Sequence, residues 1–331
     1  MKAVIANRSG GPEVLEVRDV PIPEPGPGQL RLRVAYASLN PLDTHTRAAR
    51  VAYKAQAFPY TPGFEFAGVV DAVGPGVDPS LIGSRRSFVG DPGGCAEFAL
   101  ARVDSPFCAL FEVPDDLSWQ LATVMPCAVF TPWHLLHTAG RLRPGDVVLF
   151  HGAAGTVAVV GAQIARRAGA RVLGLCSTRE KAEFAGRHGG ADIVVRGGGN
   201  WVEAVLEATG GRGADLIVDG VAGPEAARNF EALAPFGQVA YLGAIGGSAP
   251  PVDVSSQLYA KSIAVRGFLL YTALRETGGA ELPEIIADLR DGRIQVPITG
   301  VWSLDRVAEL HRRFESRELI GKQLVEVGGE L

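Results

Sequence analysis

Residues 146–178 read DVVLFHGAAGTVAVVGAQIARRAGARVLGLCST. The apolar run at 147–150 predicts a buried strand, and the small residues at 152–155 predict a tight turn directly after it. A helical segment follows to about residue 168, and a second apolar run at 172–176 predicts another strand. Strand, turn, helix and strand in this order form the opening unit of a doubly wound α/β fold with a parallel sheet.

The small-residue turn is suited to a pyrophosphate group. Free N–H groups and the positive end of the helix dipole meet where a helix begins, so an anion is stabilised there. The usual G-x-G-x-x-G pattern appears here as Ala153-x-Gly155-x-x-Ala158. Its middle glycine, which lets the backbone approach the phosphate, is present. The turn predicts a dinucleotide site, and the alternative is a βαβ unit that binds no nucleotide.

The end of the second strand indicates which dinucleotide is bound. An NAD site usually carries Asp or Glu there, roughly 20 residues after the turn, to bond the ribose 2′-hydroxyl. This chain instead has Ser177, Thr178 and Arg179, followed by Lys181. Hydroxyls and cations donate strong hydrogen bonds to a 2′-phosphate, so the sequence predicts NADP(H). The alternative is that Arg179 and Lys181 are solvated residues, because two glutamates are interleaved with them.

Composition and charge narrow the class of protein. The 331 residues are enough for two domains, and a chain that is 47% hydrophobic and 21% charged fits a globular cytoplasmic protein. The net charge of −4 argues against nucleic-acid or anionic-membrane partners. No signal peptide or membrane span is expected from the apolar runs. The four cysteines form no C-x-x-C pair, so neither a disulfide framework nor structural zinc is expected.

The rest of the chain divides by its periodicity. Before the central stretch, alternation typical of half-buried antiparallel strands occurs at 2–7, 14–20, 29–38, 64–73 and 96–103. After it, strands are predicted at 191–195, 214–221, 238–243 and 262–270, with helices at 201–209 and 224–234. Six strands starting at Val147 would complete one doubly wound sheet, with residues 219–221 and 242–244 beside the cofactor. The tail, with helices at 282–291 and 305–316 and strands at 299–304 and 321–327, is expected to rejoin the N-terminal domain.

Motifs spread over nearly the whole chain point to one family. They are NPLD at 40–43, PGFE at 62–65, AGVV at 67–70, VG at 73–74, GCAEF at 94–98, PCA at 126–128, Thr131 and Trp133, residues 145–158, Asp219, and GK at 321–322. Together they resemble the zinc-independent quinone oxidoreductase (zeta-crystallin-like) branch of the medium-chain dehydrogenase/reductase superfamily. The resemblance implies a GroES-like β-rich catalytic domain (1–124 and 271–331), a Rossmann dinucleotide-binding domain (125–270), and a homodimer formed through the edge strand at 263–270.

The resemblance also bears on metal and activity. Zinc-dependent members of the superfamily carry a cysteine where this chain has Asn40 and a histidine where it has Phe64. Because zinc requires thiolate or imidazole ligands, we expect no metal. The implied activity is hydride transfer from NADPH to a small-molecule electron acceptor, either a quinone or an α,β-unsaturated carbonyl. The alternatives are an enoyl-thioester reductase of a biosynthetic pathway and a nucleotide-binding sensor or structural protein with reduced catalysis.

Site residues follow from the same resemblance. Asn40, Asp43 and Thr131 are expected at the nicotinamide end, although Asp43 has the alternative role of capping a helix. His45 stands where quinone reductases commonly carry a tyrosine, and it or Tyr53 is the candidate proton donor; the alternatives are a partly buried helix residue and a wall residue. The expected cofactor contacts are Thr131, Ala154, Gly155, Thr156, Val157, Ser177, Thr178, Lys181, Arg196, Val221, Leu242, Gly243, Phe268, Leu270 and Lys322.

Overall fold

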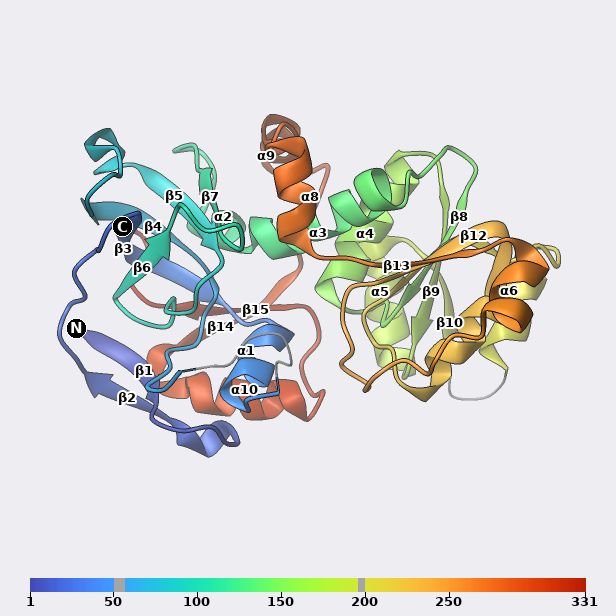
Figure 1. Ribbon diagram of the computed structural model, residues 1–331, viewed down its shortest axis with the longest axis horizontal. Coiled ribbons are helices and arrows are strands. Elements are labelled where there is room, and N and C mark those ends of the chain that lie inside the picture. Colours follow the sequence, from blue (N-terminus) through green and yellow to red (C-terminus); the bar gives the residue numbers. More distant parts are fainter. Residues whose placement is uncertain (51–56, 196–199) are drawn as a thin grey trace. The chain divides into compact units, whose positions relative to one another are not determined.

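The computed structural model describes residues 1–50, 57–195 and 200–331, which divide into two compact units (Figure 1). The β-rich unit comprises Met1–Cys127, Glu281–Asp291 and Pro297–Leu331. The parallel-sheet unit comprises Ala128–Ala280 and Gly292–Val296. The domain boundaries drawn from the sequence, after residues 124 and 270, remain our proposal.

The parallel-sheet unit contains the doubly wound sheet expected from the sequence. Its six parallel strands lie in the order β10-β9-β8-β11-β12-β13. They are β8 (Val147–His151), β9 (Arg171–Cys176), β10 (Asp192–Val195), β11 (Ala214–Asp219), β12 (Leu233–Tyr241) and β13 (Ala264–Gly267). Its helices are α3 (Thr131–His134), α4 (Thr156–Arg167), α5 (Arg179–Gly189), α6 (Trp201–Ala208), α7 (Asn229–Ala232) and α8 (Leu270–Thr277). The strand order reverses between β8 and β11, where such sheets bind ligands.

Helix α4 packs closely on this sheet because its middle residue is glycine. A Cβ atom on Gly161 would lie 2.7 Å from the ring of Phe150, which is itself buried in β8. Helices α4 and α5 contact each other, as do α6 and α7, and the two pairs cover the two faces of the sheet (Figure 1). This arrangement leaves the carboxyl ends of the strands for a ligand.

Two predicted elements of this unit are wrong in part. The strand predicted at 262–270 is only four residues long, because the chain already enters α8 at Leu270. The buried residues of α8 are Leu270, Ala273 and Leu274, a helical spacing that the apolar run before it concealed. The helix predicted at 224–234 ends at residue 232, because β12 begins at residue 233.

The β-rich unit is built on a seven-stranded sheet. Its strand order is β14-β15-β3-β4-β5-β7, and β6 pairs with β3. The strands are β3 (Gln29–Ser38), β4 (Glu65–Val73), β5 (Arg85–Val89), β6 (Phe98–Arg102), β7 (Ala109–Glu112), β14 (Ile298–Ser303) and β15 (Lys322–Glu326), with a separate pair, β1 (Lys2–Ala6) and β2 (Leu15–Asp19). The helices are α1 (Pro41–Arg47), α2 (Trp119–Met125), α9 (Leu282–Arg290) and α10 (Val307–Glu315).

The tail of the chain is integral to this unit. β15 pairs with β3, and α10 lies beside α1 (Figure 1), where Arg47 forms an ion pair with Glu315 at 2.7 Å. The core packs around buried residues of the central strands, among them Leu30, Leu32, Phe66 and Phe88. Shorter 3-10 and π segments are Pro12–Val14, Pro79–Leu81, Pro126–Phe130, Leu135–Ala139, Pro224–Arg228, Val254–Leu258, Tyr259–Lys261 and Leu304–Arg306. Of the helices in the described part of the chain, none has the length and apolarity needed to span a bilayer.

Candidate active site

Three strands of the β-rich unit bring polar side chains to one edge of its sheet. β3 is antiparallel to both β4 and β15, so its carboxyl end lies beside their amino ends. Ser38 ends β3, Glu65 begins β4 and Lys322 begins β15. Asn40 lies two residues after the end of β3 and is the N-cap of α1. We call these four residues the Lys322 cluster.

Short polar contacts hold the Lys322 cluster together. The ammonium Nζ of Lys322 donates to Oδ1 of Asn40 at 2.8 Å and to Oε2 of Glu65 at 3.0 Å. The amide Nδ2 of Asn40 donates to the same Oε2 at 2.8 Å and to Oγ of Ser38 at 3.1 Å. The Ser38 hydroxyl donates to Glu65 as well, and the backbone N–H of Cys127 donates to Oε1 of Glu65 at 2.6 Å.

The ion pair within the cluster is buried. The side chains of Lys322 and Glu65 are 4% and 0% exposed. A buried charge is tolerated when it is paired and hydrogen-bonded, and removing one partner of such a pair costs about 3–5 kcal/mol. Sequence reasoning expected Lys322 to contact the cofactor and missed Glu65, although this acidic residue in an apolar strand was a usable signal. In the structure the two charges face each other.

Asp43 lies next to the cluster, on the inner side of α1. Its carboxylate accepts the backbone N–H groups of Asn40, Gly63 and Phe64 at 2.9, 2.7 and 3.3 Å. The side chain is fully buried, and burial raises its pKa to about 6 although these N–H groups act in the opposite direction. These contacts are those of a helix cap, which is the alternative role given for Asp43 above. The same carboxylate also holds the turn at Gly63.

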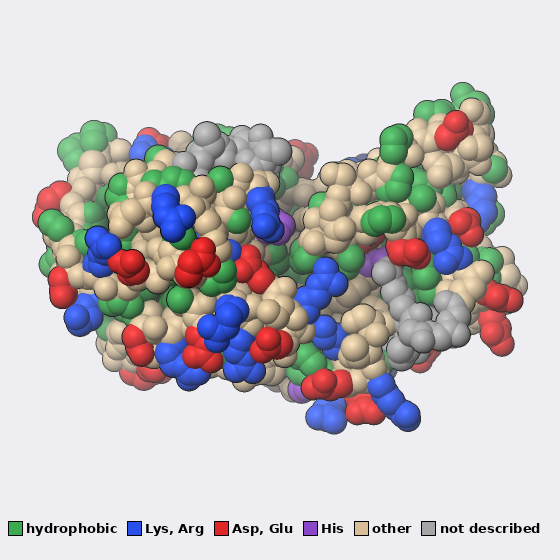
Figure 2. Space-filling view, turned by 90° about the horizontal axis from the view of Figure 1, so that it is seen from below, with side chains coloured by type: hydrophobic (Ala, Val, Ile, Leu, Met, Phe, Trp, Pro, Cys, Tyr) green, Lys and Arg blue, Asp and Glu red, His purple; other side chains and the backbone are tan. Residues whose placement is uncertain are grey.

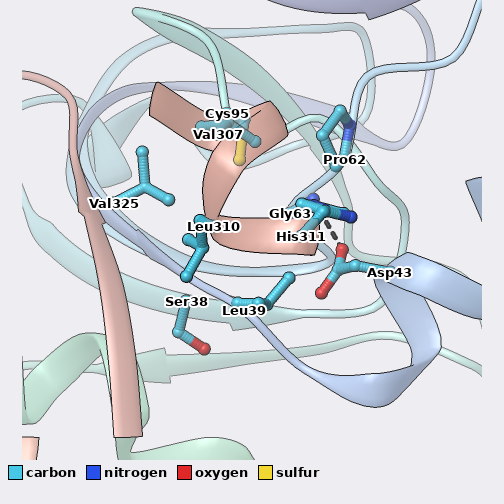
Figure 3. A pocket seen from close by; sticks show the side chains of 10 residues that line it. All are labelled: Ser38, Leu39, Asp43, Pro62, Gly63, Cys95, Val307, Leu310, His311 and Val325. Carbon is cyan, nitrogen blue, oxygen red and sulfur yellow. Dashed lines mark hydrogen bonds between the residues drawn. The ribbon is translucent and has the colours of Figure 1, made fainter. Parts of the chain in front are cut away.

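A small pocket lies behind Asp43 (Figure 3). Ten residues line it, including Asp43, Gly63, Leu310 and His311. The space between their atoms amounts to about 180 Å³, but no part of it is wide enough to hold a water molecule. Burial and the neighbouring Arg47 lower the pKa of His311 to about 3, so this histidine is neutral at physiological pH. The pocket is a feature of packing and offers no volume for a substrate.

Of the two candidate proton donors, His45 lies in the described part of the chain. His45 is half-buried in α1, and burial followed by the charge of Arg50 lowers its pKa. Its neutral form therefore predominates at pH 7. Tyr53, the other candidate proton donor, and Arg196, one of the expected cofactor contacts, lie outside the described residues.

In the parallel-sheet unit, the turn after β8 leaves the start of α4 open to a ligand. Gly152 has a φ of 61°, and the N-cap Gly155 is exposed and makes no side-chain cap. A Cβ atom on Gly155 would lie 3.1 Å from the carbonyl of Gly152. Thr156 and Val157 open the helix, half-buried, and Ala154 is buried in the turn. Because the first N–H groups of a helix have no partner within it, this end suits a phosphate.

The start of α5 carries the residues expected at a 2′-phosphate. Ser177 and Thr178 are exposed, and Thr178 caps α5 by accepting the N–H of Lys181 at 3.3 Å. Lys181 itself is half-buried. Arg179 forms an exposed ion pair with Glu183 at 3.5 Å. This residue therefore agrees with the alternative given above, that of a solvated side chain without a phosphate partner. The hydroxyls and Lys181 thus remain the group suited to an anion.

The other expected cofactor residues follow the carboxyl ends of neighbouring strands. Asp219 ends β11 and accepts the N–H of Val221 at 2.8 Å, which shapes the loop after that strand. Leu242 and Gly243 follow β12, and Phe268 follows β13, where its N–H donates to the carbonyl of Tyr241 at 2.8 Å. The remaining two, Leu270 and Thr131, begin α8 and α3. Parallel strands bring their carboxyl ends to one edge, so the loops after β11, β12 and β13 share that edge.

The described ranges contain no cluster of metal ligands, and one face of the β-rich unit carries charges of both signs (Figure 2). In those ranges, no three His, Cys, Asp or Glu side chains are arranged to hold a metal ion. On the face of the β-rich unit seen in Figure 2, Lys and Arg side chains alternate with Asp and Glu rather than forming a patch of one sign. Such a mixed surface does not favour a polyanionic partner.

Two family descriptions match the chain. Residues 26–109 match the family described as alcohol dehydrogenase GroES-like domain, and residues 156–287 match the one described as zinc-binding dehydrogenase. A 2-haloacrylate reductase of a Burkholderia species is 32% identical over 332 residues, covering 96% of this chain and 97% of that protein. A quinone oxidoreductase of Sus scrofa is 29% identical over 329 residues, covering 98% and 97%.

Two solved structures superpose on this chain over 98% of its length. A quinone oxidoreductase of Pseudomonas syringae pv. Tomato superposes with a TM-score of 0.88 at 27% identity, covering 98% of this chain and 99% of that one. A mycobacterial protein solved in complex with NADPH superposes with a TM-score of 0.87 at 29% identity, covering 98% and 100%.

Proposed function

Because this chain belongs to the quinone oxidoreductase branch of the medium-chain dehydrogenase/reductase superfamily, we propose that it reduces a quinone or an α,β-unsaturated carbonyl with NADPH and without zinc. The chain is an oxidoreductase enzyme by this membership. We propose in addition the class of the acceptor, a reaction without zinc, and the roles of single residues.

The observation that carries the zinc-free mechanism is the ammonium group of Lys322. It lies 2.8 Å from Oδ1 of Asn40, the position at which zinc-dependent members have a cysteine ligand. Neither Asn40 nor Phe64 offers zinc a thiolate or an imidazole. A metal ion bound at this point would also face the buried positive charge of Lys322 at short range.

NADPH fits the parallel-sheet unit and supplies a hydride when it is bound. The uncapped start of α4 suits the pyrophosphate, held by Ala154, Gly155, Thr156 and Val157. The remaining proposed contacts are Ser177, Thr178, Lys181 and Arg196 at the 2′-phosphate, and Thr131, Val221, Leu242, Gly243, Phe268 and Leu270 toward the nicotinamide. The hydroxyls at the start of α5 favour NADPH over NADH.

In the β-rich unit, the proposed roles concern charge and protons. Hydride addition to the acceptor leaves an enolate or a hydroquinone anion, which must gain a proton from a neighbouring group or from water. We propose His45 or Tyr53 as that donor. Asp43 acts as a positioning residue, because its buried carboxylate holds Asn40 and Gly63 in place.

We also propose a homodimer formed through β13. This strand is the edge of its sheet, and all four of its residues are exposed. Val265 within it is 41% exposed, and Leu269, two residues after it, is 43% exposed. An open apolar edge strand is a surface that proteins normally cover. Sedimentation should find a dimer, and Val265→Arg should shift it toward monomer; a wild-type monomer at micromolar concentration contradicts the proposal.

The proposed function is tested by binding and turnover together. Tryptophan fluorescence should show NADPH binding at least tenfold tighter than NADH, about 1.4 kcal/mol. NADPH oxidation should then depend on added quinone or enone and continue after dialysis against a chelator. Lys181→Ala should weaken NADPH selectively, whereas Arg187→Ala, in the last turn of the same helix, should not. Binding without turnover on any quinone, enone or enoyl thioester favours a sensor instead.

A further inference from the structure

The carboxylate of Asp219 is buried at the carboxyl end of β11 and organises the loop that follows this strand. Its Oδ1 accepts the backbone N–H groups of Val221 and Ala222 at 2.8 and 2.9 Å. Its Oδ2 accepts Nδ2 of Asn229 at 2.9 Å. Ala222 has a φ of 52°, which is uncommon for a residue with a Cβ atom. The bonds from Asp219 hold the backbone in that conformation.

The loop after β11 is in turn bonded to the loop after β12. The N–H of Gly246 donates to the carbonyl of Val221 at 2.7 Å. The N–H of Gly223 donates to the carbonyl of Gly247 at 3.0 Å. Because these bonds join the two loops outside the sheet, a displacement of the first loop also displaces the second. Asp219 therefore controls the conformation of both.

The loop after β11 also touches the turn that begins α4. A Cβ atom on Gly152 would lie 3.3 Å from Cγ2 of Val221. This contact lies between β8 and β11, where the strand order reverses and a doubly wound sheet binds the two halves of a dinucleotide on its two sides. Ser177 and Thr178, proposed for the 2′-phosphate, follow β9 on one side. The nicotinamide half therefore belongs on the other side, over the loop after β11.

We propose that Asp219 is a positioning residue for the nicotinamide half of the cofactor. This inference rests on the proposed function, because that function supplies NADPH as the ligand. Asp219 is buried and acts through Val221 and the two joined loops, which it holds in the conformation that receives this half of the cofactor. The adenosine half, bound over β9, does not depend on Asp219.

Two ligands separate the halves of the site. NADPH occupies both sides of the strand reversal, whereas adenosine 2′,5′-bisphosphate carries only the adenosine and the 2′-phosphate with one further phosphate. In isothermal titration calorimetry, Asp219→Ala should weaken NADPH binding at least tenfold and leave the affinity for adenosine 2′,5′-bisphosphate within twofold of wild type.

Asp215→Ala is the matched control for this experiment. Asp215 lies in the same strand and accepts the backbone N–H of Val147 at 2.8 Å, so its removal also breaks a bond between a carboxylate and the backbone. It lies near the amino end of β11, away from the edge that binds ligands. This variant should change neither affinity by more than twofold.

The conformation of the loops can be followed without a ligand. In hydrogen–deuterium exchange, peptides covering 220–223 and 243–247 should exchange at least tenfold faster in Asp219→Ala and at wild-type rates in Asp215→Ala. Asp219→Asn keeps an oxygen for the two N–H groups of the loop. Its new amide can donate to Oδ1 of Asn229, which has no partner in the described part of the chain, once that amide rotates. We therefore expect this variant to bind NADPH within threefold of wild type.

The outcomes separate a positioning role from a merely structural one. A structural role predicts that the affinities for both ligands fall together or that neither falls, and either result overturns the inference. A loss in Asp219→Asn as large as that in Asp219→Ala also overturns it. If Asp219→Ala does not fold, Val221→Ala removes the contact with Gly152 and should weaken NADPH at least threefold but adenosine 2′,5′-bisphosphate less than twofold; unchanged NADPH affinity contradicts the inference.

The same measurements distinguish this inference from the proposed function. Wild-type protein that binds neither ligand overturns the inference together with the cofactor assignment. Wild-type protein and variants that bind both ligands in the expected pattern, but reduce no quinone or enone, leave the role of Asp219 standing and defeat only the proposed function.

Discussion

Replacing His311 by glutamine is expected to change how stability depends on pH. The folded state lowers the pKa of His311 from 6.5 to about 3, through burial and the nearby charge of Arg47. Between these values the unfolded chain binds a proton that the folded chain does not. The free energy of unfolding therefore rises with pH across this window.

The size of the effect follows from the unfolded state. For an unfolded pKa of 6.5, linkage gives a gain of about 2 kcal/mol between pH 5 and pH 7, and any folded pKa below about 4 gives the same gain. Glutamine does not titrate and still offers an oxygen to Arg47, whose guanidinium lies 3.3 Å from Nδ1 of His311.

Urea denaturation at pH 5, 6 and 7 measures this directly. The wild type should gain about 2 kcal/mol more than His311→Gln over that range. If His311→Gln and wild type change in parallel with pH, the histidine is not held neutral by the fold and the reasoning is refuted.

Three further predictions concern Asp43, His45 and Gly161. Asp43 should affect the pH dependence of stability in the opposite direction to His311. Burial raises the pKa of Asp43 from 3.8 to about 6, so its contribution to the free energy of unfolding falls by about 3 kcal/mol in total as pH rises from about 4 to 6. Urea titrations of Asp43→Asn should lack that fall. His45→Phe should lower kcat and flatten the pH–rate profile below pH 7, and an unchanged profile removes His45 as the proton donor. Gly161→Ala should lower the free energy of unfolding by about 1–3 kcal/mol, and with it the midpoint of thermal unfolding, because the new Cβ would meet the ring of Phe150. Gly186→Ala, whose Cβ would lie in open space, should leave the midpoint unchanged.

Sequence patterns predicted the parallel-sheet unit well because its central strands β8, β9 and β11 are buried on both faces. Apolar runs such as residues 147–150 can be recognised without knowing their neighbours, and the turn at Gly155 has a local signature. The same patterns failed at Leu270, where an apolar strand passes directly into an amphipathic helix without a polar break. Local periodicity does not mark such a junction.

The candidate active site was harder to predict, because its contacts join residues far apart in the chain. Glu65 and Lys322 are 257 residues apart, and only the pairing of β3 with both β4 and β15 brings them together. Asn40 was identified through family resemblance, but its contact with Lys322 depends on the pairing of β3 with β15. Asp43 shows the reverse case: its capping role is local and was anticipated as an alternative from the residues around it.

The distance in sequence between Glu65 and Lys322 has a consequence for biosynthesis. At a synthesis rate of about 5–20 residues per second, roughly 10–50 seconds separate the appearance of the two residues. During that interval the nascent β-rich segment has neither the ammonium that neutralises Glu65 nor the strand β15 that covers β3. The parallel-sheet unit, which is almost continuous in sequence, is made within the same interval. A ribosome-bound chain that stops before residue 322 can thus have a finished nucleotide fold while the charge partner of Glu65 is still missing.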